Sequence, residues 1–226
     1  MPIDLYSFLL FLHALCFVYW LGGDLGVFYS SGILIKPGLS AESRRYVLKV
    51  MHWLDQFPRV CMPLVIALGF TMGSMRWFEL SNYWLILIWM LTAIWIYFVI
   101  ALFLNKQNKN ILSVIRKIDM AMRWIIAIAV TLIAIESFRG QSVGELKIED
   151  GWLSAKLLIW ACTVYCGIAS RYTMRPFSDA FARIMEKGDN PEDLDILKRS
   201  LYTTRIPILG IWVLVAMAGA AGIWKI

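Results

Sequence analysis

Long apolar runs dominate the 226-residue chain and recur six times between shorter polar segments. A helix needs roughly 20 mainly apolar residues to cross a bilayer, and each run has about that length. Hydrophobic residues make up 60% of the chain and charged residues only 17%, which excludes an ordinary soluble domain. The sequence therefore predicts an all-α bundle of transmembrane helices that forms one domain over residues 1–226. We expect its spans at residues 5–30, 57–76, 82–104, 121–139, 152–172 and 206–225.

The basic residues are distributed unequally between the segments that connect these spans. Three segments hold five, five and seven lysines and arginines, whereas the other two share a single lysine. By the positive-inside rule the three basic segments are cytoplasmic, and both termini lie on the non-cytoplasmic side of a bacterial-type inner (plasma) membrane. The basic residues behind the net charge of +6 thus orient the protein in the lipid bilayer, and we expect no nucleic-acid partner. The basic segments are 36–59, 105–123 and 171–205, and the other two are 77–81 and 140–151.

Three stretches within the basic segments have the apolar spacing of amphipathic helices. They are 40–54, which opens on a capping-box-like Ser40, and 177–187 and 192–201, which are separated by a Gly-Asp-Asn-Pro break. We expect all three to be interfacial helices on the cytoplasmic face. The N-terminus lacks a basic leader, so we expect the first apolar helix to stay in the protein.

His13 lies inside the first apolar run, and an ionisable residue within the membrane predicts a functional site. At a rise of about 1.5 Å per residue, His13 lies about 12 Å below the outer surface and Lys156 roughly 6 Å below it. Glu136 is at a level comparable to Lys156, with Arg139 one turn further out. We therefore expect these four residues to converge in the outer half of the bundle.

The second histidine, His52, precedes the second span on the cytoplasmic side. On this topology it lies roughly 20 Å or more from His13 along the membrane normal. Two imidazoles that hold one haem must each reach the same iron at about 2 Å. We therefore expect that His13 and His52 do not share a haem.

Three stretches of the chain resemble one membrane superfamily. They are Leu12-His13 with Trp20-Leu-Gly-Gly23, Arg59-Val-Cys-Met-Pro63 with Leu68-Gly69, and Gly151-Trp-Leu-Ser-Ala-Lys156-Leu. These stretches resemble the superfamily that contains the HemJ-type protoporphyrinogen IX oxidases and the CopD copper-resistance proteins. The resemblance covers spans one, two, five and six. HemJ-type proteins have four spans, so spans three and four look like an insertion or a different subfamily.

The resemblance to HemJ-type proteins implies a haem ligand at His13 and a second essential site residue at Lys156. A b-type haem also needs an apolar slot and cations for its propionates. Phe17, one turn from His13 on the same helix face, and Trp20 are expected to line the slot. Arg76 and Arg139 are candidate propionate partners, and the alternative for both is ordinary snorkelling to the interface.

Lys156 has three possible roles: a neutral sixth ligand, a proton shuttle, or an ion-pair partner of Glu136. If the site oxidises a porphyrinogen-like substrate, protons leave while electrons pass through the haem to quinone or another acceptor. Glu136 and Lys156 are then the expected proton-handling, catalytic residues. The sequence thus predicts a haem b protein that is redox-active, with membrane oxidoreductase chemistry left open.

Two alternatives remain at this level. Soft sulfur ligands suit Cu(I), so a copper-handling transporter is one, although sulfur-containing side chains at helical spacing also serve as core packing. The other is a noncatalytic subunit, or a homo-oligomer, in which His13 only hydrogen-bonds between chains. The copper candidates are Cys162, Cys166, Met51, Met62, Met72 and Met75.

Two local features predict helix packing rather than chemistry. Asp55 and Arg59 are four residues apart, which favours an ion pair at a helix end. Gly22, Gly23 and Gly26 give the first span a face of small residues for close helix contact.

Overall fold

The computed structural model describes residues 4–104 and 109–225, and these form helices with no β-strand. Six of the helices, or continuous helix pairs, are long and apolar enough to cross a membrane. The prediction of an all-α, multi-pass membrane bundle is therefore confirmed. The helices are α1 (Leu5–Leu34), α2 (Ala41–Leu54), α3 (Gln56–Arg76), α4 (Asn82–Leu104), α5 (Lys109–Phe138), α6 (Gly151–Thr173), α7 (Arg175–Lys187) and α8 (Pro191–Trp224).

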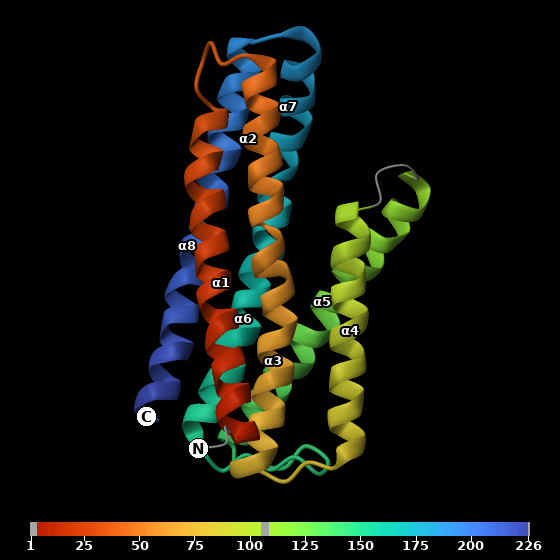
Figure 1. The fold of residues 1–226 in the computed structure, drawn as a ribbon, viewed down its shortest axis with the longest axis vertical. Helices are drawn as coiled ribbons and strands as arrows, with labels where there is room; N and C mark the ends of the chain where they lie inside the picture. Colours follow the sequence, from red (N-terminus) through yellow and green to blue (C-terminus); the bar gives the residue numbers. More distant parts are fainter. Residues whose placement is uncertain (1–3, 105–108, 226) are drawn as a thin grey trace.

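Four of the spans form the main bundle, and two stand at its side (Figure 1). Helix α1 packs against α3, and α6 packs against α8, while α4 lies on α3 and α5 lies on α6. The start of α1, the end of α8 and both weakly charged loops lie at one end, here called the termini end (Figure 1). The α1–α2 and α7–α8 connections lie at the opposite, basic end. Both ends of the chain thus lie at the same end of the bundle, as the sequence predicts.

The three stretches that we expected to lie along the membrane surface, 40–54, 177–187 and 192–201, do not lie flat. Helix α2 continues into α3, α7 continues α6, and residues 192–201 are the first turns of α8 rather than a separate helix. These segments stand upright on the basic end (Figure 1). Their apolar faces bury one another instead of a membrane surface, which explains the upright position. The buried residues of this upper cluster are Leu34, Met51, Phe177, Ala180, Phe181, Ile184 and Leu197.

Arg44 ties this upper cluster together. Its guanidinium is completely buried and donates hydrogen bonds to the backbone carbonyls of Leu34, Lys36 and Leu39. It also forms an ion pair with Asp189 at 2.9 Å. Carbonyls at a helix end have no partner within the helix, so the side chain of Arg44 closes the end of α1 and fixes the turn that leads to α2.

Close contact between α1 and the α2–α3 junction depends on two glycines. A β-carbon at Gly23 would lie 2.7 Å from Cδ of Pro58 and 2.8 Å from the carbonyl oxygen of Leu54. A β-carbon at Gly26 would lie 2.6 Å from Cδ1 of Leu54, whereas one at Gly22 would meet nothing within 4 Å. The predicted small-residue contact is thus confirmed for Gly23 and Gly26 but not for Gly22.

Candidate functional site: a cationic cavity above a buried charge layer

A cavity of about 740 Å³ lies between the four helices of the main bundle, toward the termini end. Its walls come from α1, α3, α6 and α8, and most of the side chains that line it are apolar or aromatic. The volume falls within the range of about 300–1,000 Å³ that is typical of small-molecule and cofactor sites. His13, Phe17, Trp20, Arg76 and Lys156 all line it. The structure therefore brings five of the seven predicted site residues to one cavity.

His13 lines this cavity, and one of its ring nitrogens has no partner among the described residues. Its ring lies against α3 beside Gly69, where a β-carbon would make an ordinary van der Waals contact of 3.7 Å with Cε1. The Nδ1 atom is buried and has no hydrogen-bond partner among the described residues. An unpaired polar atom in an apolar site has a high free energy, so a metal ion or a hydrogen-bonding ligand is stabilised there.

Lys156 projects from α6 toward α8. A β-carbon at Gly222 would lie 2.7 Å from its Nζ atom, so the glycine leaves the space that the ammonium needs. The ammonium lies 5.7 Å from the ring centroid of Trp152 and makes no ion pair with any residue that the structure describes. Its charge is therefore available to a ligand in the cavity.

Two more cations line the same cavity near the termini end. The guanidinium of Arg76 stacks on the Tyr6 ring at 3.6 Å, and the Lys225 ammonium lies 5.9 Å from the centroid of Trp77. Among the described residues, the lining includes no aspartate or glutamate. A cavity with cations but no carboxylate favours a ligand with an apolar body and one or more anionic groups.

Phe17 and Trp20 occupy the deeper part of the cavity. Phe17 packs against α8, where a β-carbon at Gly219 would lie 3.2 Å from its ring. Trp20 is 4% exposed, and with Trp160 of α6 it separates the cavity from the core at the middle of the bundle. We call Trp20 and Trp160 the tryptophan floor.

Glu136 and Arg139 do not join the other candidates. They form an ion pair with each other at 2.8 Å near the end of α5, and the Arg139 side chain is 65% exposed. Neither residue lines the cavity, so the predicted convergence with Lys156 and the alternative Glu136–Lys156 ion pair are both wrong. The physical reason is that α5 packs beside α6 rather than joining the four helices that surround the cavity.

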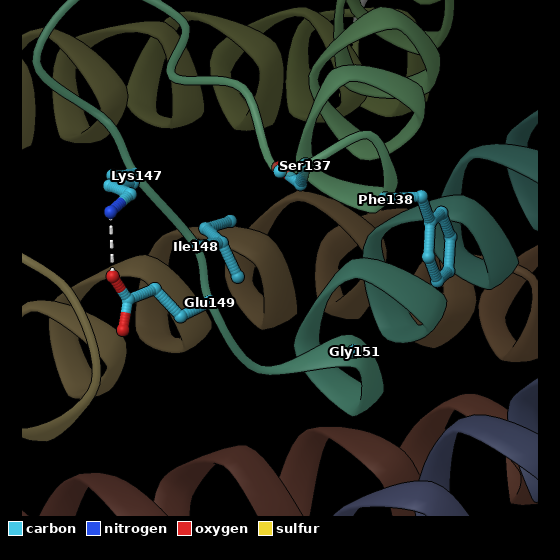
Figure 2. A pocket seen from close by; sticks show the side chains of 7 residues that line it. Ser137, Phe138, Lys147, Ile148, Glu149 and Gly151 are labelled. Atoms are coloured by element: carbon cyan, nitrogen blue, oxygen red, sulfur yellow. Dashed lines mark hydrogen bonds and ion pairs between the residues drawn. The ribbon is translucent and has the colours of Figure 1, made fainter.

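A second, smaller hollow of about 350 Å³ lies beside the α5–α6 loop (Figure 2). Figure 2 shows its charged residues, Lys147 and Glu149, paired at 2.8 Å. Both side chains are exposed, and the hydrogen bond from Lys147 lowers the pKa of Glu149. The two charges satisfy each other in solvent, so this hollow lacks the unpaired groups that distinguish the larger cavity.

His52 lies elsewhere, and of the sulfur-containing copper candidates Met72 lines the cavity. His52 is on α2 and stacks on Phe103 of α4 with the ring centroids 5.0 Å apart, outside the cavity lining. Met51, Met62 and Met72 belong to three different core clusters. In the described parts of the chain, no three His, Cys, Asp or Glu side chains gather as a metal site would require.

Below the tryptophan floor lies a group of charged residues that sequence reasoning missed. Asp119 of α5 is completely buried and pairs with Arg123 at 3.1 Å and with Arg171 of α6, also at 3.1 Å. Arg123 and Arg171 were assigned to cytoplasmic loops, but Arg123 is 2% exposed in the interior of α5. The spacing of Asp119 and Arg123, four residues apart, was the available signal.

The same group continues toward α1 and α3. Arg59 pairs with Asp55, as predicted, and also lies within electrostatic range of Asp119 and Asp24. Asp24 of α1 lies one helical turn after Trp20, within interaction range of its indole. We call Asp24, Asp55, Arg59, Asp119, Arg123 and Arg171 the charge layer.

Comparison of the chain with models of known protein families, with curated proteins and with solved structures finds no match in any of the three.

Proposed function

We propose that this multi-pass membrane protein binds haem b in the cationic cavity, that His13 would supply a ligand to its iron, and that the protein is redox-active. The observation that carries the proposal is the buried, unpartnered Nδ1 of His13 in a cavity of cofactor size. Imidazole is a common axial ligand of haem iron. The helices that carry the family resemblance, α1, α3 and α6, all contribute to the walls of this cavity.

The remaining lining fits the same group. The aromatic and aliphatic walls suit an apolar macrocycle, and Arg76, Lys156 and Lys225 suit its carboxylates. When bound, haem supplies one-electron redox chemistry, and the protein tunes it through the axial ligand and the surrounding charges. The chain itself contributes orientation by the packed Phe17 and Trp20 rings and exclusion of water from the deeper cavity.

We further propose that Lys156 is the residue that handles protons if a porphyrinogen-like substrate is oxidised. Its unpaired ammonium faces the cavity, whereas Glu136 lies outside it. Once its ammonium has released a proton to water near the termini end, the neutral amine of Lys156 can accept a proton from the substrate. The electron acceptor in this scheme is a quinone or another membrane-soluble acceptor. By the positive-inside rule, we place the basic end in the cytoplasm and the chain in the inner (plasma) membrane.

Absorption spectra of the detergent-purified protein, oxidised and dithionite-reduced, test the proposal. We expect a Soret band in the wild-type protein and in His52→Ala, and its loss in His13→Ala. His52→Ala is the matched control because it removes the other imidazole of the chain, outside the cavity. A wild-type protein without haem, after expression with ample haem supply, would contradict the proposal.

A further inference from the structure

We infer that Asp24 is a proton-exchanging carboxyl group that connects the charge layer to the cavity across the tryptophan floor. Protons would pass between the basic end and the cavity by binding to and leaving one carboxylate oxygen, Oδ2. No electron transfer or additional reactant is needed. The inference does not rest on haem, because the residues that carry it lie below the cavity.

Asp24 differs from the other carboxylates of the charge layer in its partners. Asp119 pairs with two arginines, and Asp55 pairs with Arg59. Asp24 forms no ion pair within the described ranges, and its buried Oδ2 has no hydrogen-bond partner. A carboxylate in a membrane span has a high free energy unless it is paired, hydrated or protonated.

The charges of the layer explain why Asp24 can bind and release a proton. Its three guanidinium groups keep their positive charge at all accessible pH values. With all three aspartates ionised the layer has no net charge, and with Asp24 protonated it has one positive charge. Burial and the nearby carboxylate of Asp55 favour the protonated form of Asp24, whereas Arg59 favours its ionised form.

A second unpartnered group lies in the same layer. Arg123 is 2% exposed, and its Nη2 atom is buried without a hydrogen-bond partner. Its Nε atom is held by Asp119, and Arg59 and Asp55 lie within electrostatic range. The charge layer thus holds one buried donor and one buried acceptor without a partner among the described residues, and buried waters commonly satisfy such groups.

Trp20 connects this layer to the cavity. Its ring lines the cavity, and Asp24 follows it by one helical turn on the same face of α1, within interaction range of the indole. On the other side of the floor, Trp160 contacts Trp95 with ring centroids 6.5 Å apart, and Trp95 lies 5.1 Å from the guanidinium of Arg123. The floor thus borders the charge layer at Trp20, one helical turn from Asp24, and at Trp160 by way of Trp95.

The other charged groups of the layer come from the α2–α3 junction, α5 and α6. Asp55 and Arg59 face Asp24 from the α2–α3 junction, and both act on its charge. Asp119 and Arg123 of α5 and Arg171 of α6 act on Arg59 and form the rest of the layer. Asp24 is the member of this group with a free carboxylate oxygen in the part of the chain that the structure describes.

Proton flux into liposomes tests the inference. The full-length protein is reconstituted with internal pyranine, and valinomycin with a potassium gradient imposes a membrane potential. We expect wild-type vesicles to change internal pH faster than protein-free vesicles, with the flux lost in Asp24→Asn and retained in Asp24→Glu. Asp195→Asn is the control, since this aspartate is exposed, pairs with Arg199 and lies outside the charge layer. Its flux should equal that of the wild type.

Three outcomes of the flux measurement would overturn the inference. A wild-type flux equal to that of protein-free vesicles would exclude the route, and an unchanged flux in Asp24→Asn would exclude Asp24. A flux that requires sodium in place of choline would also overturn it, in favour of a metal cation at Oδ2. Infrared spectra of the wild type in H₂O and D₂O give a measurement that does not depend on variant folding. We expect a protonated-carboxyl band that shifts in D₂O, and its complete lack across the accessible pH range would count against the proposal.

Discussion

Gly222 of α8 leaves the space that the Lys156 ammonium of α6 occupies, since a β-carbon at position 222 would lie 2.7 Å from Nζ. No hydrogen bond or ion pair of the described residues holds this ammonium, so the position of Nζ depends on how the two helices pack. Helices α6 and α8 make the most extensive helix contact of the structure. The position of the Lys156 ammonium in the cavity thus depends on Gly222, which has no side chain.

Substituting this glycine tests the role of Lys156 in ligand binding. We expect Gly222→Ala to displace the ammonium, which is the end of a flexible side chain, with little effect on thermal stability. If Lys156 contacts the proposed haem, the Soret maximum or the haem content per protein changes. Gly167→Ala on α6 is the control, because a β-carbon there would meet nothing within 4 Å. Identical spectra for Gly222→Ala and Gly167→Ala would contradict a contact between Lys156 and the haem.

Gly23 and Gly22 make a matched pair for helix packing. In Gly23→Ala the new β-carbon meets the backbone of Leu54 and the ring of Pro58, neither of which can move freely. We expect a loss of about 1–3 kcal/mol in unfolding free energy, as for overpacking of a core. Gly22→Ala meets nothing and should be neutral or stabilising by about 0.5–1 kcal/mol, since alanine favours a helix. Reversible denaturation in detergent measures both, and equal effects would contradict the close contact.

The buried pairs of Asp119 should contribute strongly to stability. Asp119→Asn removes the charge that pairs with Arg123 and Arg171, and leaves buried guanidinium groups without compensation. We expect a loss of about 3–5 kcal/mol, the range for breaking a buried ion pair. The exposed Asp195–Arg199 pair provides the comparison, since Asp195→Asn should cost less than about 1 kcal/mol. Thermal unfolding of the two variants would be expected to differ clearly, and similar midpoints would argue against a buried Asp119.

Arg44 is expected to hold the basic end of the bundle together. Arg44→Met keeps much of the buried volume but removes the donors to Leu34, Lys36 and Leu39. Each buried carbonyl that is left without a partner costs about 1–3 kcal/mol. Hydrogen exchange over residues 35–39 should therefore become faster, while Arg45→Met, at the exposed neighbouring position, should leave it unchanged. Equal exchange in both variants would contradict the structural role of Arg44.

Much of the membrane topology could be predicted from the sequence, because a span is a local property of composition and length. The six apolar runs correspond to six helical segments, and the α1–α2 and α7–α8 connections, both rich in basic residues, lie at the end opposite the chain termini (Figure 1). The placement of His13 and Lys156 in the same half of the bundle followed from the constant rise of a helix. The ion pair of Asp55 and Arg59 followed from its helical period.

What only the tertiary structure decided is which helix faces which neighbour. Depth along a helix follows from counting residues, but its rotation and partners depend on side chains that are distant in sequence. Glu136 therefore shares a predicted level with Lys156 yet lies outside the cavity, on a helix beside the four that form it. Arg123 and Arg171 read as loop charges because their shared partner, Asp119, becomes visible only when α5 packs on α6. The amphipathic pattern of the segments at the basic end fits a membrane surface as well as it fits a neighbouring helix. Only the fold shows that their apolar faces pack against one another.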